Sequence, residues 1–185
     1  MQNQRANRGL VIVVSGPPGS GKTTVAKLLA ERLGLRYVSI GALFRKIAEE
    51  RGLSLIELNK LAEQDPSIDR ELDAKAREEA LRGNVVIDGH ISAWIVGDLA
   101  DLKVGIIAPF EVRISRIAQR DGKSLDEVAE ETRKREESER QRFLRYYGID
   151  IRDLTVFDIV INSAKYSPDQ IVDMIVGVLK LMNKI

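Results

Sequence analysis

The chain has 185 residues, with 29 lysines and arginines against 28 aspartates and glutamates, so its formal net charge is +1. Hydrophobic residues make up 44% and charged residues 31%, which is typical of one folded domain and argues against a disordered chain. The charge balance excludes a broad basic surface for nucleic acid or for an anionic membrane, but it is compatible with a local basic pocket. Because there is no cysteine, disulfides, thiolate metal sites and cysteine nucleophiles are excluded.

The beginning of the chain lacks the pattern of a signal peptide or a membrane span. Its apolar run Leu10–Val14 is short, whereas a span needs about 20 apolar residues. The polar stretch Met1–Gly9 has no periodicity, and we expect it to be a frayed leader. We therefore expect a cytoplasmic protein.

Strand and helix patterns alternate along the chain, and several of the helices begin at a capping Ser or end at a Gly. In chain order the expected elements are strand 10–15, helix 22–33, strand 37–40, helices 42–51, 54 onward and 67–82, strand 85–87, a short helix near 91–96, strand 104–108, helices 111–120 and 124–145, strand 158–161 and helix 167–182. This alternation predicts an α/β fold of three layers, in which about five parallel strands carry helices on both faces. Ligands bind such folds beyond the carboxyl ends of the strands.

A glycine-rich segment between the first expected strand and helix matches the pattern G-x-x-x-x-G-K-[ST]. Its residues are Gly16, Pro17, Pro18, Gly19, Ser20, Gly21, Lys22 and Thr23. The glycines permit a tight loop whose backbone N–H groups surround phosphate oxygens at the start of a helix. Lys22 is expected to contact the β- and γ-phosphates, and Thr23 to ligate Mg²⁺. The motif predicts a nucleoside triphosphate site; the alternative is a turn with an accidental lysine.

Two classes of nucleotide hydrolase fit the sequence poorly. GTPases of the Ras type usually carry N-K-x-D, but residues 59–62 read Asn-Lys-Leu-Ala. Motor and AAA-type ATPases usually have an acidic pair after their second metal-site strand, whereas Asp88 is followed by Gly89. The helix-rich segment before residue 85 is instead typical of a small-molecule kinase that holds an acceptor there.

Arginines at helical spacing follow in the second half of the chain. Two sets lie near one helix face each: Arg113, Arg116 and Arg120, and Arg135, Glu139 and Arg142. Phosphoryl transfer requires cations around the moving group, and a phosphorylated acceptor adds a second anion. The alternative is a solvated, salt-bridged surface, because residues 111–145 are rich in both signs of charge.

With these features, the chain resembles the nucleoside monophosphate kinases, and more narrowly the archaeal-type cytidylate kinases. The resemblance covers about residues 10–181, and beyond the loop it rests on the stretches 37–45, 68–73, 135–139, 147–150 and 158–162. It implies one P-loop kinase domain over residues 1–185, with an acceptor-binding insert at about 41–82. It also implies a short lid at about 120–142 that closes over ATP.

The resemblance also implies roles for individual residues. The segment from Gly16 to Thr24 would hold ATP, with Arg116 along the adenine. The catalytic residues would be Lys22, Arg120 on the ATP phosphates, Arg135 on the transferred phosphoryl group, and Asp88. Thr23 would bind Mg²⁺ directly and Asp88 through water. The acceptor site would include Arg45 on its phosphate, Glu139 and Arg142 near its sugar and phosphate, and Ser39, Gly41, Asp69 and His90.

His90 departs from the family pattern, which usually has an arginine after Asp88-Gly89 to meet the acceptor phosphate. A histidine cannot make the bidentate contact of an arginine, and it carries only a partial charge near neutral pH. Either His90 donates to that phosphate more weakly, or it is a polar residue at the strand end. In the second case another arginine, such as Arg77 or Arg82, takes the phosphate.

The function expected from the sequence is Mg²⁺-dependent transfer of the ATP γ-phosphoryl group to CMP and dCMP. Alternatives are an adenylate kinase-like enzyme, a kinase for another small molecule, and a nucleotide-binding protein without transfer. Partners would be ATP and a nucleoside monophosphate, without nucleic acid or membrane, and a monomer is the favoured oligomeric state. Trp94 is interpreted as core packing, with base stacking as the alternative. The acidic residues should cover the outer faces, while one cleft should collect Lys22, Arg45, Arg116, Arg120, Arg135 and Arg142.

Overall fold

The computed structural model of the chain describes residues 8–185, in which five parallel strands form one sheet in the order β2-β3-β1-β4-β5. The strands are β1 (Val11–Ser15), β2 (Arg36–Ser39), β3 (Val85–Asp88), β4 (Leu102–Ile107) and β5 (Ile159–Asn162). The expected α/β fold with a parallel sheet of about five strands is confirmed. Of the expected leader Met1–Gly9, residues 1–7 lie outside the described part, while Arg8 donates to the Leu99 carbonyl at 2.5 Å.

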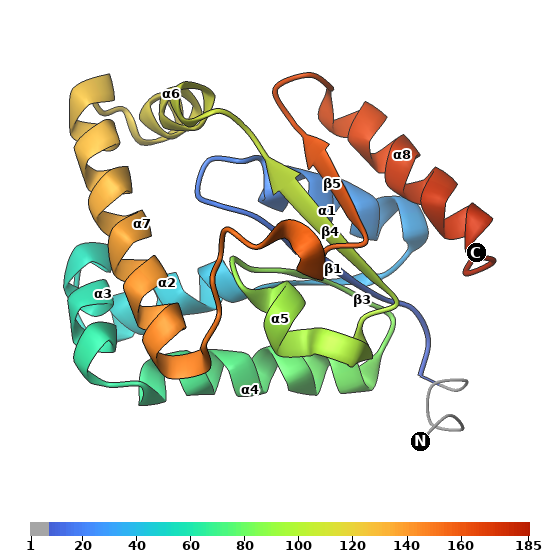
Figure 1. The fold of residues 1–185 in the computed structure, drawn as a ribbon, viewed down its shortest axis with the longest axis horizontal. Helices are drawn as coiled ribbons and strands as arrows, with labels where there is room; N and C mark the ends of the chain where they lie inside the picture. Colours follow the sequence, from blue (N-terminus) through green and yellow to red (C-terminus); the bar gives the residue numbers. More distant parts are fainter. Residues whose placement is uncertain (1–7) are drawn as a thin grey trace.

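Helices cover both faces of the sheet (Figure 1). Helices α1 (Lys22–Leu33) and α8 (Pro168–Leu181) lie on one face, and α4 (Ser67–Arg82) and α5 (Ser92–Val96) lie on the other. The central strand β1 serves both layers, since Ile12 and Val14 pack with α1 and α8 while Val11 and Val13 face α4 and α5. This two-sided burial explains why the strand is a continuous apolar run rather than an alternating one.

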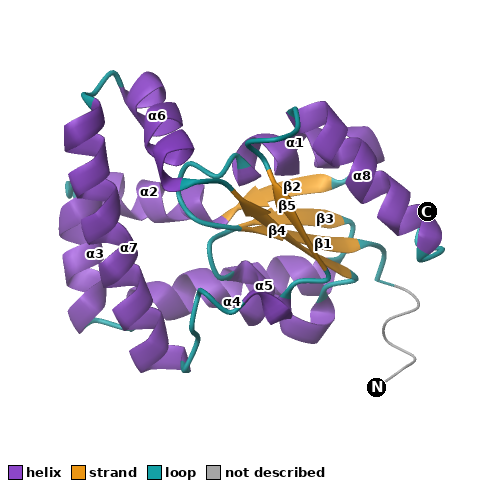
Figure 2. Ribbon diagram, turned by 45° about the horizontal axis from the view of Figure 1, so that its top comes forward, coloured by secondary structure: helices purple, strands orange, loops and turns teal. Residues whose placement is uncertain are grey.

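Four further helices lie beyond the carboxyl ends of the strands (Figure 2): α2 (Ile40–Glu50), α3 (Leu55–Gln64), α6 (Phe110–Asp121) and α7 (Leu125–Tyr147). Helices α2 to α4 share a small core of their own, formed by Ala48, Leu58, Ala62 and Ile68. Short 3₁₀ turns follow α5 (Gly97–Leu99) and precede β5 (Leu154–Val156). Within residues 8–185, no helix is both long enough and apolar enough to cross a membrane.

Several element boundaries differ from expectation by one or two residues, and two of these differences have a clear structural reason. Ile40, expected to end a strand, begins α2, because the Ser39 side chain caps that helix by accepting from the Ala42 N–H at 3.2 Å. Strand β4 begins at Leu102, two positions before the expected 104, because Leu102 already pairs with Ile12 of β1. Trp94 packs edge-on against Phe157 at 5.5 Å in the α4–α5 core, which agrees with the core-packing interpretation.

Candidate active site

The glycine-rich loop turns tightly between β1 and α1 at the carboxyl edge of the sheet. Gly19 has φ of +77°, and a Cβ there would lie 2.6 Å from the Arg113 carbonyl oxygen. Gly21 has φ of +88° and is the N-cap of α1, where it offers no side chain to the N–H groups of the first turn. These N–H groups are therefore available to an anion at the positive end of the helix dipole.

Arg113 holds the backbone of this loop in place through hydrogen bonds. Its buried guanidinium donates to the carbonyl oxygens of Pro18 at 3.0 Å and Ala108 at 3.2 Å, and it forms an ion pair with Glu136 of α7. Helical spacing predicted that Arg113 lies with Arg116 and Arg120 among the phosphate-facing arginines, and it predicted no role for Glu136. In the structure Arg113 instead fixes the loop backbone, because its donors are occupied by protein carbonyls and a carboxylate.

Asp88 accepts hydrogen bonds from hydroxyl groups of neighbouring elements. Its Oδ2 atom accepts hydrogen bonds from Thr23 Oγ1 at 2.7 Å, Tyr37 at 3.1 Å and Ser39 Oγ at 3.2 Å. Burial and the Asp88 charge raise the pKa of Tyr37 to about 12, so its hydroxyl stays a donor. The buried Oδ1 atom of Asp88 has no hydrogen-bond partner within the described part of the chain.

This arrangement fits a shared Mg²⁺ site. Among residues 8–185, no group of three or more histidine or acidic side chains could hold a metal ion alone. Mg²⁺ is commonly held by one or two protein oxygen ligands together with substrate phosphates and waters. Thr23 supplies a hydroxyl oxygen, and the free Oδ1 of Asp88 would accept a hydrogen bond from a metal-bound water. The donor set therefore fits Mg²⁺ bound jointly with ATP.

Lys22 lies among other cations at the start of α1. Its Nζ donates to the Pro17 carbonyl at 3.3 Å. Burial lowers the pKa of Lys22, and the charges of Arg135 and Arg45 lower it further, whereas Asp88 and Glu139 oppose the shift. Arg45 lies beside Gly41, since its Nη1 would be 3.6 Å from a Cβ at that position, an ordinary van der Waals contact. Lys22, Arg45 and Arg135 thus form a region that attracts a polyanion.

Glu139 is a buried counter-ion shared by His90 and Arg135. It is only 4% exposed, and its two carboxylate oxygens contact Arg135 Nε at 2.7 Å and His90 Nδ1 at 2.6 Å. Burial alone would raise the pKa of Glu139, but Arg135 and His90 hold it well below its usual range. Glu139 therefore stays ionised and joins the end of β3 to α7.

The two alternative arginines are occupied elsewhere. Arg77 donates to the Ile95 carbonyl at 2.7 Å, and Arg82 forms ion pairs with Glu78 and Glu79. His90, in contrast, lies beside Glu139 and through it beside Arg135. A contact between His90 and an acceptor phosphate stays a prediction.

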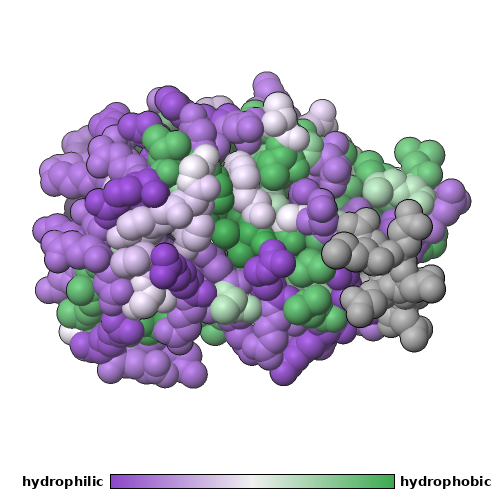
Figure 3. All heavy atoms as spheres, turned by 60° about the horizontal axis from the view of Figure 1, so that its bottom comes forward, coloured by the Kyte–Doolittle hydropathy of each residue, from purple (hydrophilic) through white to green (hydrophobic). Residues whose placement is uncertain are grey.

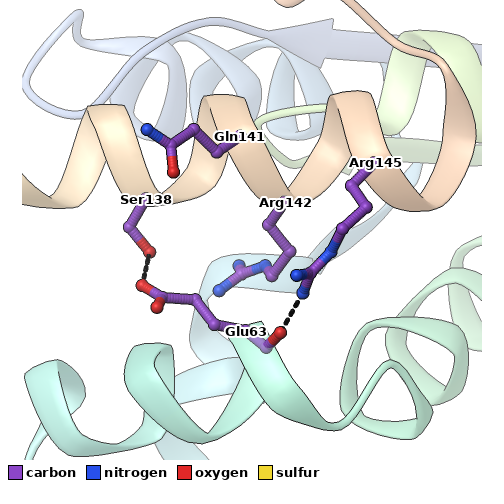
Figure 4. A pocket seen from close by; sticks show the side chains of 5 residues that line it. All are labelled: Glu63, Ser138, Gln141, Arg142 and Arg145. Carbon is purple, nitrogen blue, oxygen red and sulfur yellow. Dashed lines mark hydrogen bonds between the residues drawn. The ribbon is translucent and has the colours of Figure 1, made fainter.

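Arg142 is buried between α3, α4 and α7. It is 3% exposed, its Nε lies 2.8 Å from Asp69, and its Nη1 donates to the backbone and side-chain oxygens of Asn59 at 3.2 Å. Figure 4 shows Arg142 pointing from α7 towards α3, beside two contacts that Glu63 makes with Ser138 and Arg145. These contacts tie α7 to the helical segment between β2 and β3.

The expected convergence of six cations holds only in part. Arg116 donates to the side chain and backbone of Ser163, at 2.8 Å in both cases, in the loop after β5. The Arg120 side chain is 67% exposed and pairs with the adjacent Asp121 at 2.6 Å, so it does not lie in the cluster. Arg142 forms an ion pair with Asp69, so its charge is already balanced and does not add to the cluster.

The expectation that acidic residues outside the cleft cover the outer faces is wrong for Glu79, which is buried beside Arg36. Asp69, Asp88 and Glu139 were expected in the site and do not lie on the outer faces. All three are buried because each serves as a partner for cations or hydroxyl groups within the fold.

Thr24, the last residue of the segment expected to hold ATP, is exposed in the first turn of α1.

Sequence reasoning also missed several residues that shape the site. Tyr37 lies within a stretch that carried the resemblance, but its contact with Asp88 depends on the pairing of β2 with β3. Ser163, which donates to the Ser20 carbonyl at 2.6 Å, directly follows the last strand. The rule that ligands bind at carboxyl strand ends could have found it. No comparable local signal pointed to Asn59 or Glu136.

Comparisons with known proteins agree with this geometry. Residues 11–165 match the model of the cytidylate kinase-like family. A cytidylate kinase of Staphylothermus marinus is 54% identical over 166 residues, which cover 90% of this chain and 94% of that protein. A cytidylate kinase of Ignicoccus hospitalis is 52% identical over 165 residues, covering 89% and 96%.

A solved structure shares the fold at lower identity. Shikimate kinase from Acinetobacter baumannii in complex with shikimate has a TM-score of 0.63 and 19% identity, covering 98% of this chain and 99% of that one. This likeness shows the P-loop kinase fold alone. Because the family match spans most of the chain and the relatives are so similar, the chain belongs to the cytidylate kinase-like family.

Proposed function

We propose that the chain is an ATP-dependent kinase that phosphorylates CMP and dCMP, giving CDP and dCDP. The observation that carries this proposal is the identity of 54% and 52% to two cytidylate kinases over almost their whole length. The cation cluster of Lys22, Arg45 and Arg135 supports it, because it suits two phosphorylated substrates.

On the donor side, the amides of the loop and Lys22 would hold the β- and γ-phosphates of ATP. Arg116 and the loop at Ser163 would border the adenine. Thr23 and Asp88 would hold Mg²⁺, which when bound neutralises phosphate charge and helps to orient the phosphates. We assign Arg120 to the ATP phosphates as well, which requires it to leave Asp121.

On the acceptor side, Arg45 and His90 would bind the acceptor phosphate, whose oxygen is already an oxyanion and needs no general base. That oxygen attacks the γ-phosphorus, the bond to the bridging oxygen breaks, and ADP leaves. Arg135 would stabilise the negative charge that spreads over the transferred group. Glu139 would orient both Arg135 and His90 for this step.

We assign the acceptor-binding insert to about residues 41–82 and the lid to about 120–142. The contacts of α3 with α7 support coupled movement of these two parts. Closure would exclude water and limit ATP hydrolysis. We further propose that the enzyme works as a monomer on free nucleotides.

A panel of acceptors tests the proposal: CMP, dCMP, UMP, AMP and GMP, each with Mg²⁺-ATP, measured as kcat/KM for nucleoside diphosphate formation. CMP and dCMP should be the best acceptors. A marked preference for AMP would favour an adenylate kinase-like enzyme instead. Binding of ATP without transfer to any acceptor would indicate a nucleotide-binding protein. Lys22→Met, prepared in parallel, controls for contaminating kinases.

A further inference from the structure

A groove between α4, α5 and the end of α7 has no role in the reaction described so far. It has a volume of about 580 Å³, and its lining includes Arg70, Asp73 and Arg77 of α4, Trp94 of α5 and Tyr147 of α7. Figure 3 shows the face formed by α4 and α5, where apolar side chains gather in the middle between hydrophilic borders. The groove thus combines aromatic surfaces with a few charged groups, as small-molecule sites do.

Helix α7 leads from the phosphate-binding residues to this groove. Arg135, Glu139 and Arg142 lie on successive turns of the helix, and Tyr147 is its last residue. At 1.5 Å per residue, the 12 steps from Arg135 to Tyr147 span about 18 Å. This length accommodates a transferred phosphoryl group, an acceptor phosphate and a nucleoside placed end to end.

Two other elements contribute residues beside α7. His90 follows β3, and Trp94 comes four residues later, in α5. On α4, Asp69 and Asp73 are one turn apart on the same face, and the charge of Arg142 acts on both carboxyl groups. Charge interactions through Glu139 and Arg142 therefore connect His90 with Asp73.

Asp73 lies at the end of this path with an acceptor atom to spare. The Tyr147 hydroxyl lies beside its carboxylate but has no hydrogen-bond partner among residues 8–185. Burial and Asp73 together raise the pKa of Tyr147, so the hydroxyl stays protonated and able to donate. The Oδ2 atom of Asp73 is buried and has no hydrogen-bond partner among residues 8–185. A buried acceptor without a donor is unfavourable, so this position suits a ligand that brings an N–H group.

We propose that Asp73 selects cytosine over uracil by accepting a hydrogen bond from the exocyclic amine of the acceptor base. Tyr147 positions the carboxylate, and Trp94 contacts the base ring. Cytosine carries the N4 amine as a donor, which carboxylates recognise, whereas uracil has a carbonyl oxygen there that a carboxylate repels. This inference rests on the proposed phosphorylation of CMP and names the group that sets the choice of base.

The substitution Asp73→Asn tests the inference, because an amide can donate to the uracil oxygen as well as accept. The measurement is kcat/KM for CMP and for UMP at saturating Mg²⁺-ATP. The CMP-to-UMP ratio should fall about 10- to 100-fold, as for one base contact, mainly through KM of the acceptor. Glu71→Gln, an exposed carboxyl on the same helix, is the matched control and should leave the ratio unchanged.

An unchanged CMP-to-UMP ratio would overturn the inference, whether kcat/KM stays the same for both acceptors or falls by the same factor for both. Tyr147→Phe removes only the hydroxyl and should lower the ratio by a smaller factor. If Asp73→Asn does not fold, an unchanged ratio in Tyr147→Phe overturns the inference. The proposed function fails separately, when the wild-type chain phosphorylates no pyrimidine nucleotide.

Discussion

The phosphate loop and the proposed acceptor side differ in what holds their functional groups in place. The loop is a backbone feature, shaped by Gly19 and Gly21 and held by Arg113 through the Pro18 carbonyl. The acceptor side is made of buried side chains from distant segments, such as Asp69 of α4 and Glu139 of α7. Changes in the loop should therefore affect catalysis for every acceptor, whereas changes on the acceptor side should affect stability and choice of acceptor.

The largest effect should come from Lys22→Met. Removal of one charge that stabilises the transition state should lower kcat about 10²- to 10³-fold with every acceptor. Steady-state assays with CMP and UMP at saturating ATP measure this loss. Lys180→Met, on the exposed side of α8, is the control and should retain wild-type turnover. Near-normal turnover in Lys22→Met would show that the Lys22 charge does not contribute to catalysis.

Arg113→Met should give the next largest effect, on stability. It removes a buried cation from Glu136 and leaves the Pro18 and Ala108 carbonyls without their donor. The free energy of unfolding should fall by about 3 kcal/mol, measured by urea denaturation. Arg120→Met in the same helix breaks an exposed pair and should cost less than about 1 kcal/mol. Equal losses in the two variants would show that Arg113 does not support the loop.

Glu139→Gln should act on the acceptor side. The neutral side chain keeps a hydrogen-bond acceptor but leaves Arg135 and His90 without their common counter-ion. We expect a loss of about 1–3 kcal/mol in the free energy of unfolding and a higher KM for CMP, with KM for ATP little changed. Glu137→Gln, exposed on the same helix, is the control. A rise in KM for ATP alone would contradict the division between the two regions.

The smallest effect concerns pH. Burial raises the pKa of Asp69 and of Asp73 to about 6 each. Because the folded carboxyl groups hold protons more tightly than the unfolded ones, their contribution to stability is present below about pH 4 and is lost as the pH rises through about 6. Asp73→Asn should therefore reduce the drop in unfolding free energy between pH 5 and pH 7.5 by about 1–2 kcal/mol. Urea denaturation at both pH values measures this, and an unchanged drop contradicts the assignment.

Sequence patterns predicted the structure around the glycine-rich loop well because its parts are contiguous. The β1 apolar run, the glycine spacing and the start of α1 at Lys22 all lie within one short segment. The bounds of α4 were predicted at both ends, since Gly83 stops the helix. In these places local chemistry and tertiary structure agree.

The acceptor side was predicted less completely because its geometry depends on partners far apart in the chain. Spacing could place Arg135, Glu139 and Arg142 on one helix face, but it could not show that Asp69 neutralises Arg142. It also could not show that Glu79 is buried, where this carboxylate forms ion pairs with Arg36 and Arg82. Asp73 and Tyr147 gained a possible role only when the structure placed them around a groove.

Phosphorus NMR of the wild-type chain with Mg²⁺-ATP and CMP tests the central claim most directly, because one spectrum follows donor, acceptor and products together. We expect the CDP and ADP signals to grow in equal amounts while the ATP and CMP signals decline. Formation of ADP and inorganic phosphate without CDP would contradict it, as would spectra that do not change.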